Sequence, residues 1–525
     1  MAHGQKAVVL ESQLEYLSLS KPKRILYKFT HFFTDMPKKI SRKTRDIPAK
    51  TRKRTNSFLN IFKTIGRAMK YGDWKTRLSF IFMGLGQITR HQIIRGSLYM
   101  LFEACFIAFM IFVGGPSLSK FGSLGYIASG SYSQFQGIID ITVPVYFDNS
   151  FTILLYSLLA IMMILLIVVL WYGQLKDALT LQEREEIGKY ASDKQTLENV
   201  FDKSYAGTLL FLPMGTLALF TILPMIMMVL IAFTNYDYNH QPTGKLFDWV
   251  GMYNFGTVLA MTSDGSTVIF RVFIQVLVWT LIWAFFATFT NYFLGMIVAM
   301  IINIKGIKLK KLWRTVLITT IAVPQFISLL LISQIFADGG ILDSLLQQWH
   351  ITTKNVGFLS DPILAKVMII LINTWVGIPY TMLICTGLLM NIPEDLYESA
   401  RIDGASPARM YFKITLPYML FVTGPYLISQ FVGNINNFNV IYLLSGGVPP
   451  YSSTFVGEAI PALVRDSGVV HTDLLITWIY RITTNKQFDY GAASVLSLLI
   501  FAVIAFFSLI FYNRSSAVQD EEAFQ

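Results

Sequence analysis

Long apolar stretches separated by shorter polar segments make up most of the chain beyond its N-terminal region. A helix needs about 20 mostly apolar residues to cross a bilayer. The pattern therefore predicts an all-α polytopic membrane protein with about eight transmembrane helices. The eight stretches lie at 97–113, 150–173, 207–234, 274–303, 314–336, 366–389, 418–444 and 490–512.

The positions of Lys and Arg between these stretches predict how the chain is oriented. Short cytoplasmic loops are rich in both residues, whereas external loops are poor in them. Five lie within 305–314 and three within 401–413, but only one lies in each of 114–149, 235–267 and 337–363. The first two loops are therefore expected to face the cytoplasm, as are both termini.

The composition agrees with a membrane protein, because 54% of the 525 residues are hydrophobic and only 14% are charged. Soluble domains carry a larger charged share. The two cysteines lie inside apolar stretches and predict neither a disulfide framework nor a zinc site. The sequence has no phosphate-binding loop, metal-ligand cluster or nucleophile motif. The chain is therefore expected to be neither an ATPase nor another enzyme, and to hold no metal or cofactor.

The net charge of +11 is concentrated at the N-terminus, where residues 1–96 contain 21 Lys and Arg but only 5 Asp and Glu. Such a basic flank is typical of a cytoplasmic segment that contacts anionic lipid, so membrane lipid and not nucleic acid is the expected partner. Residues 78–95 mix apolar and charged positions, which favours a helix in the membrane interface but is also compatible with short spans. The predicted regions are a basic tail with interfacial helices (1–96), two spans (97–173), a charged cytoplasmic connector (174–206), a six-helix core (207–512) and a cytoplasmic C-terminal tail (513–525).

Polar residues inside the predicted spans are candidates for a transport path, because an amide in a bilayer is costly unless it faces a cavity or a partner. Asn373, Gly377 and Tyr380 recur at intervals of four and three, which places them on one helical face. Asn434 and Asn437 share a face of the next span in the same way. Amides match sugar hydroxyls in hydrogen bonding, and aromatic rings offer flat apolar faces to a sugar. The alternative is hydrogen bonding between helices.

The cytoplasmic segment 391–417 contains several helix start and stop signals. Pro393 suits a first helical position, and Gly404 suits the left-handed conformation that ends a helix. These signals predict a short helix over 393–403. Ser406 and Pro407 predict a second start directly afterwards.

Three groups of residues in this segment resemble the EAA loop of binding-protein-dependent ABC importers: Glu398-Ser399-Ala400, Asp403-Gly404-Ala405 and Ile414-Thr415-Leu416-Pro417. In that family the loop is the coupling helix, which docks into a cleft of the ATPase subunit. The resemblance thus implies ATPase coupling for Glu398, Ser399, Ala400, Asp403, Gly404 and Ala405. The sequence departs from the motif only at Ser399, where the family has alanine. ATP and Mg would be bound by the partner ATPase subunits.

Residues 207–520 are similar to the larger, MalF-like membrane subunit of maltose/maltodextrin importers. The segments that carry this resemblance are VGMYNF, NTWVGIPY, GNINNF, TDLLITWIYRIT and DYGAAS, which begin at residues 250, 373, 433, 472 and 489. The resemblance implies a type I importer core, and substrate contacts by Asn373, Val376, Gly377, Tyr380, Asn434 and Asn437.

This resemblance also implies partners: a second, MalG-like permease subunit, two ATPase subunits and an extracytoplasmic sugar-binding protein. Two departures stand out. The external loop 235–267 lacks the large domain that some relatives insert there, and Gly433 replaces an aromatic residue of the family's sugar site. Trp375 is a further aromatic candidate for sugar contact.

Other functions remain compatible with the sequence. Permeases for galacto-oligosaccharides, raffinose-type sugars or acidic oligosaccharides are close alternatives. An ion-coupled secondary transporter usually has ionisable groups within its spans, yet the six core spans contain no Asp or Glu. A membrane-anchored enzyme or scaffold would need a folded soluble site, for which the chain leaves little room.

Overall fold

The computed structural model describes residues 49–126, 147–188, 193, 205–241, 245–259, 266–304, 306–445 and 461–514. The N-terminal tail up to residue 48, most of the second half of the predicted connector 174–206 and the end of the C-terminal tail lie outside the described residues. The chain forms two units, which we describe separately. Unit 1 comprises residues 1–127 and 146–227, and unit 2 comprises residues 128–145 and 228–525.

Unit 1 contains α8, a continuous helix of 37 residues that includes both the predicted second span and the start of the predicted connector. The elements α6, η1 and α7 pack along it. The described helices of this unit are α3 (Ala49–Tyr71), α4 (Trp74–Leu78), α5 (Leu85–Ile88), α6 (Ile93–Phe109), the π-helical turn η1 (Met110–Gly114), α7 (Gly115–Ser119), α8 (Ser150–Glu186), α10 (Tyr205–Leu217), the π-helical turn η2 (Ala218–Ile222) and α11 (Leu223–Ile231), which ends in unit 2.

The segment 78–95 is not one interfacial helix, because turns separate α4 from α5 and α5 from α6. A polar cluster ties this segment to the end of α8. The Arg90 side chain is 3% exposed and donates to both carboxylate oxygens of Asp73 at 2.7 Å and to Glu185 Oε2 at 2.9 Å. Burial raises the pKa of Asp73, but hydrogen bonds from Thr76 and Arg90 outweigh this effect and lower it. A buried guanidinium with two carboxylate partners avoids the cost of an unpaired charge.

Unit 2 contains the remaining helices. Described in chain order, they are α12 (Tyr253–Val258), α13 (Ser266–Asn303), α14 (Lys310–Ala322), α15 (Gln325–Phe336), α16 (Ile341–Gln348), α17 (Pro362–Leu389), α18 (Glu394–Ile402), α19 (Pro407–Met410), the π-helical turn η3 (Tyr411–Thr415), α20 (Leu416–Ile435), α21 (Phe438–Ser445), α22 (Ala462–Ser467), α23 (Leu475–Thr484) and α24 (Tyr490–Arg514).

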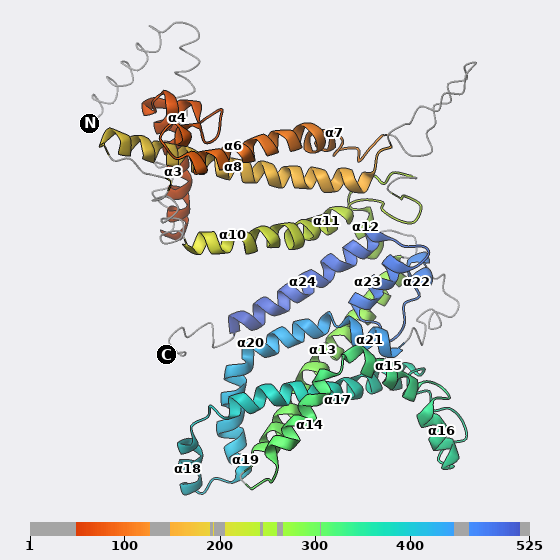
Figure 1. Ribbon diagram of the computed structural model, residues 1–525. Coiled ribbons are helices and arrows are strands. Elements are labelled where there is room, and N and C mark those ends of the chain that lie inside the picture. The colour runs from red at the N-terminus through yellow and green to blue at the C-terminus, as the bar shows by residue number, and fades with distance from the viewer. Residues whose placement is uncertain are drawn as a thin grey trace, which may run out of the picture. The chain divides into compact units, whose positions relative to one another are not determined.

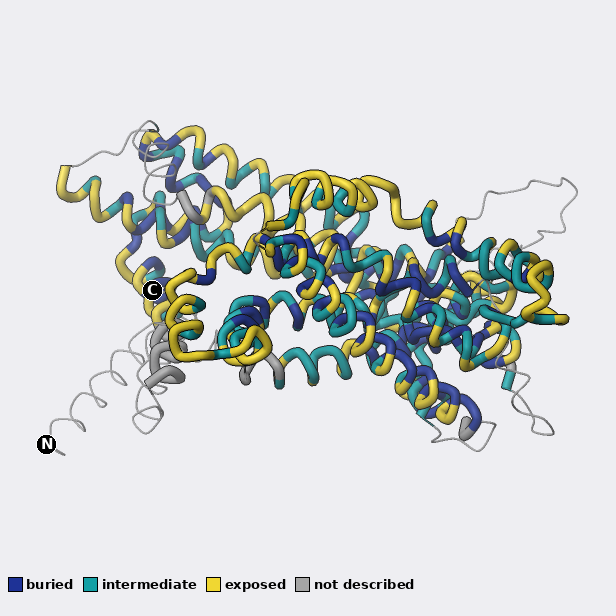
Figure 2. Tube along the Cα trace, turned by 90° about the horizontal axis from the view of Figure 1, so that it is seen from below, coloured by how far each residue is buried: buried dark blue, intermediate teal, exposed yellow. Residues whose placement is uncertain are grey.

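The long helix α13 organises unit 2. It packs against α17 and α20 and contributes buried side chains to three hydrophobic clusters. The first cluster also contains residues of α23 and α24, and the second contains residues of α15, α17 and α21. The third contains residues of α17 and α20. Trp283 lies in the middle of this helix and is fully buried. Figure 2 shows that many of the long helices bury one side and expose the other. An exposed apolar side is what a lipid environment requires.

Seven helical segments of the described part are long and apolar enough to cross a membrane: Ile93–Ser119, Ser150–Glu186, Leu209–Ile231, Val268–Asn303, Gln325–Gln348, which includes both α15 and α16, Pro362–Leu389 and Tyr490–Ile510. Two predicted spans are interrupted instead of continuous. The predicted span 314–336 is divided between α14 and α15, because Pro324 has no N–H to donate and the residue before it, Val323, is extended with ψ of 124°. The predicted span 418–444 is divided between α20 and α21, where the Asn437 side chain accepts from the backbone N–H of Val440 at 3.3 Å.

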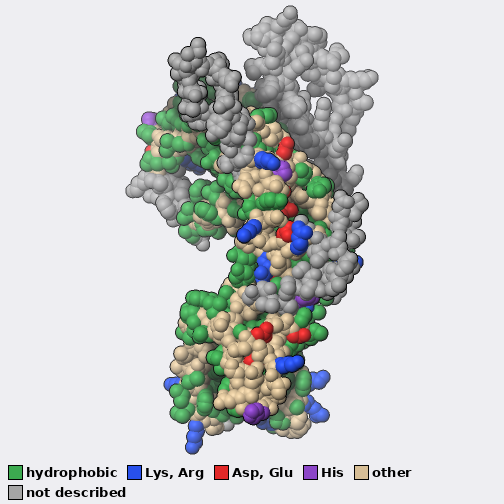
Figure 3. All heavy atoms as spheres, turned by 90° about the vertical axis from the view of Figure 1, so that its right-hand side faces the viewer, with side chains coloured by type: hydrophobic (Ala, Val, Ile, Leu, Met, Phe, Trp, Pro, Cys, Tyr) green, Lys and Arg blue, Asp and Glu red, His purple; other side chains and the backbone are tan. Residues whose placement is uncertain are grey.

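The helices α18 and α19 lie at one end of the long helices of unit 2, and α16, α22 and α23 lie at the other (Figure 1). At the latter end Asp473 is fully buried, and its carboxylate accepts from Arg481 Nε at 2.9 Å and from the N–H of Val470 at 2.8 Å. Burial raises the pKa of Asp473 despite these partners. On the face drawn in Figure 3, charged side chains are scattered among hydrophobic and uncharged ones.

Candidate functional site

A cavity of about 380 Å³ lies inside unit 2 between α13, α14, α15, α17 and α20. All six residues that were predicted to contact substrate line this cavity: Asn373, Val376, Gly377, Tyr380, Asn434 and Asn437. The structure therefore brings together two sets of residues that lie on different helices. Their role in binding stays a prediction.

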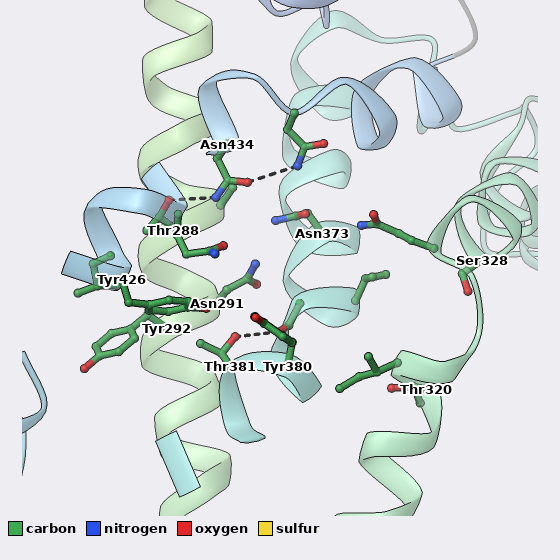
Figure 4. Close-up of a pocket in the computed structure, with 18 of the residues that line it drawn as sticks. Thr288, Asn291, Tyr292, Thr320, Ser328, Asn373, Tyr380, Thr381, Tyr426 and Asn434 are labelled. Atoms are coloured by element: carbon green, nitrogen blue, oxygen red, sulfur yellow. Dashed lines mark hydrogen bonds between the residues drawn. The ribbon is translucent and has the colours of Figure 1, made fainter. Parts of the chain in front are cut away.

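The face of α17 supplies four of these residues. Asn373 is 5% exposed, whereas Tyr380 is 49% exposed and offers its ring to the cavity (Figure 4). Trp375 was a further aromatic candidate, but it does not line the cavity and is 66% exposed. The reason is helical geometry, because residues two positions apart on a helix do not share a face.

Asn434 and Asn437, the other two predicted amides, lie at the break between α20 and α21. Asn434 Nδ2 donates to Thr288 Oγ1 on α13 at 3.0 Å, and Asn437 Nδ2 donates to Asn434 Oδ1 at 3.3 Å. Trp283 Nε1 donates to the carbonyl oxygen of Asn434 at 3.0 Å. Part of the hydrogen-bonding capacity of these amides is thus used within the protein, as the packing alternative requires. Gly433 does not line the cavity, and a Cβ there would meet nothing within 4 Å.

The break between α14 and α15 forms the opposite wall. Val323 and Pro324 line the cavity at the break itself, and Gln325 and Ser328 follow them on α15. A helix that starts inside the bundle leaves its first N–H groups without partners in the same helix. Irregular backbone at membrane depth is tolerated where it lines a cavity, which is the arrangement seen here.

Sequence reasoning missed several residues of the lining. The missed polar and aromatic residues include Thr288, Asn291, Gln325, Ser328, Tyr426 and Gln430. Asn291 and Gln430 carry the signal that was used for Asn373, namely an amide inside an apolar stretch. Gln430 also lies four residues before Asn434, which places both on one face of α20.

The lining of the cavity defines which ligands it suits. It contains six carboxamide side chains, hydroxyl groups and three tyrosines, but no Asp, Glu, Lys, Arg or His. Carboxamides and hydroxyls both donate and accept hydrogen bonds, and tyrosine rings present apolar faces. Such a surface fits an uncharged molecule with many hydroxyl groups. It presents no carboxylate, imidazole, ammonium or guanidinium group to a ligand.

The described part of the chain has no group of three or more His, Cys, Asp or Glu side chains that could hold a metal ion. The second candidate site is the loop that connects α17 to α20, which the sequence predicted to be a docking segment. Its first helix, α18, extends over Glu394–Ile402, which agrees with the predicted helix 393–403 within one residue at each end. Pro393 lies just before the helix and not in it.

The turn after α18 has the geometry that the sequence predicted. Gly404 has φ of 74°, and the N–H of Ala405 donates to the carbonyl oxygen of Ala400 at 2.9 Å. The N–H of Asp403 donates in the same way to Ser399 at 3.0 Å. Ser406 begins the second helix, α19, by accepting from the N–H of Arg409 at 3.3 Å.

This loop exposes apolar side chains. No residue of α18 is buried, and Ile402 at its end is 87% exposed. Met390 before it and Phe412 after it are 70% and 62% exposed. The hydroxyl groups of Tyr397 on α18 and Thr415 in η3 lie 2.8 Å apart, which ties the helix to the start of α20. An exposed apolar side chain such as Ile402 is available for contact with a partner.

The chain is similar to known membrane transport proteins. A family model described as a binding-protein-dependent transport system inner membrane component matches residues 291–519. The maltodextrin transport system permease protein MalC of Streptococcus pneumoniae is 31% identical over 459 residues, which cover 85% of this chain and 97% of that protein. The galactooligosaccharides transport system permease protein GanP of Bacillus subtilis is 31% identical over 448 residues, 84% of this chain and 97% of that protein. The maltose/maltodextrin transport system permease protein MalF of Vibrio parahaemolyticus is 37% identical over 229 residues, 43% of this chain and 41% of that protein.

Proposed function

This chain belongs to the family of binding-protein-dependent transport system inner membrane components, and we propose that it translocates a neutral oligosaccharide, maltose or a maltodextrin, through the cavity of unit 2. Membership makes the chain a multi-pass membrane permease subunit of an ABC sugar importer, which is not itself catalytic. Family membership does not specify the sugar or the residues that bind it, and both are part of our proposal.

The lining of the cavity is the observation that carries this proposal. Its six carboxamides match sugar hydroxyls, and the half-exposed ring of Tyr380 offers a stacking surface. The absence of a basic side chain from the lining favours a neutral sugar over an acidic oligosaccharide, whose carboxylates would be buried without a partner. The absence of an acidic side chain from the lining argues against a proton- or sodium-coupled transporter.

A maltodextrin is preferred among neutral sugars because two of the three relatives described above are maltodextrin-type permeases by name. GanP makes galacto-oligosaccharides the second candidate. Both sugars present hydroxyl groups to the same amides.

ATP hydrolysis by partner subunits would drive transport through the cavity. We propose that α18 and α19 dock into an ATPase subunit, which binds ATP and Mg, and that Glu398, Ser399, Ala400, Asp403, Gly404 and Ala405 form or shape this contact. The exposed Ile402 supports a protein partner at this helix. The full importer would contain two ATPase subunits, a second, MalG-like permease and an extracytoplasmic binding protein. The loop 391–417 and both chain termini would face the cytoplasm, and 445–489 would face outward.

The test is reconstitution. The chain is purified in mild detergent with the subunits that accompany it and is incorporated into liposomes together with its binding protein. Uptake of labelled maltotriose, galactotriose and an acidic trisaccharide is then compared with ATP inside or outside the vesicles. We expect uptake of a neutral sugar only when ATP is on the side of the coupling loop. Uptake that follows a proton or sodium gradient without ATP would refute the proposal.

A further inference from the structure

Two amides in the cavity have buried atoms without partners. The Oδ1 atom of Asn291 on α13 and the Nδ2 atom of Asn373 on α17 are both buried, and neither makes a hydrogen bond. One is an acceptor and the other is a donor. In Figure 4 the two side chains extend from facing helices into the space between them.

Gly377 lets the Asn291 side chain lie against α17. A Cβ at position 377 would lie 2.3 Å from Asn291 Nδ2 and 2.7 Å from its Cγ, so only glycine lets the Asn291 amide lie against the backbone of α17. Asn373 is one helical turn away on the same face of α17. Asn291 and Asn373 thus both lie where α13 packs against α17, and both line the cavity.

Such unpaired atoms call for an explanation, because a buried polar atom without a partner costs free energy and is rare in native proteins. The neighbouring Asn434 and Asn437 show that the local packing can satisfy amides, since both make hydrogen bonds to the protein. A hydroxyl group is the complement of the unpaired atoms, because it can donate to Asn291 Oδ1 and accept from Asn373 Nδ2 at the same time.

We infer that Asn291 and Asn373 together bind one hydroxyl group of the transported sugar, and that Asn291 is a substrate-recognising residue that the sequence did not reveal. This inference rests on the proposed function. It assigns α13, which otherwise serves as the central packing helix of unit 2, a direct part in substrate recognition. Gly377 then acts indirectly, by keeping the Asn291 amide beside α17.

The experiment uses the complex purified without its binding protein, so that the cavity reports binding. Equilibrium binding of labelled maltotriose, galactotriose and raffinose is measured for the parent, Asn291→Leu, Asn373→Leu and the double variant. Thr290→Val is the matched control, because Thr290 lies on α13 next to Asn291 but pairs with Thr374 at 3.0 Å and does not line the cavity. Thermal unfolding of each complex is measured with and without sugar.

We expect each leucine variant to weaken binding of the preferred sugar about 10-fold, the effect of one lost hydrogen bond with its orphaned partner. The double variant should be little weaker than either single variant, because both amides serve one hydroxyl. The unfolding temperature without sugar should not fall, since leucine replaces an amide with an unpaired atom. The control should bind like the parent.

Other results decide against the inference in different ways. A lower unfolding temperature of Asn291→Leu without sugar, with unchanged sugar affinity, would show that Asn291 stabilises the helix packing and does not bind substrate. Losses that add fully in the double variant would show two separate contacts and would overturn the shared hydroxyl. A parent complex that binds none of the three sugars would contradict the proposed function, and the inference would fall with it.

Discussion

Replacing Gly404 by valine is expected to uncouple ATP hydrolysis from sugar transport. Gly404 has φ of 74°, a region in which a residue with a Cβ is strained by about 1–2 kcal/mol and a β-branched residue by more. A Cβ at this position would meet no atom within 4 Å, so the strain comes from the backbone alone and not from a clash. The turn between α18 and α19 must then shift, which misplaces the docking surface.

The size of the effect follows from this strain. About 1.4 kcal/mol corresponds to a tenfold change in an equilibrium, so we expect half-maximal sugar-stimulated hydrolysis to need about 10-fold more ATPase subunit or to be lost. The matched control is Gly404→Asn, because asparagine tolerates the left-handed region far better than valine. Hydrolysis is measured in liposomes at a series of ATPase subunit concentrations. If the valine and asparagine variants titrate like the parent, the turn does not set the docking geometry.

Three further predictions test the two sites and the orientation of the chain in the membrane. Glu398→Lys should lower sugar-stimulated ATP hydrolysis while the membrane complex still assembles, because a charge reversal at an interface creates like-charge contacts. At an ordinary surface position the same substitution would change stability by about 0.5 kcal/mol or less and would leave hydrolysis unchanged. Alanine at both Tyr380 and Asn437 should reduce uptake at least 10-fold with subunit stoichiometry intact, and normal uptake kinetics in a well-expressed variant would favour the packing role of these residues. A cysteine at Ser406, in a chain without its native cysteines, should react with an impermeant maleimide only after the cells are opened; labelling of intact cells would invert the predicted topology.

The sequence predicted the α17 side of the cavity because helical periodicity is a local property. Asn373, Gly377 and Tyr380 had to share a face of any continuous helix, and the structure places all three on the cavity. The turn at Gly404 could be predicted for the same reason, since glycine, serine and proline act on the backbone within a few residues. Helical spacing also excludes Trp375 from the cavity. It was named as a candidate because its aromatic ring could contact a sugar, although its position on the helix should have excluded it.

The helix breaks could not be predicted in this way. Pro324 ends α14, yet Pro379 and Pro425 lie inside the continuous helices α17 and α20. The presence of a proline therefore does not predict whether a helix continues or ends at that point. The outcome depends on how the neighbouring helices pack around it. The role of Asn291 depends on contact with Gly377, which is 86 positions later in the chain, and no local pattern reports such a contact.

The exposed apolar surface around α18 has a consequence for the life of the protein in the cell. Ile402, which is 87% exposed, would face cytoplasmic water whenever the chain is made without the ATPase partner that we propose for this loop. Quality-control proteases and chaperones recognise such surfaces, so an orphan copy should be degraded faster than an assembled one. The abundance of this chain would then follow the supply of its ATPase subunit, and the cell would keep the subunits in fixed proportion without a dedicated regulator.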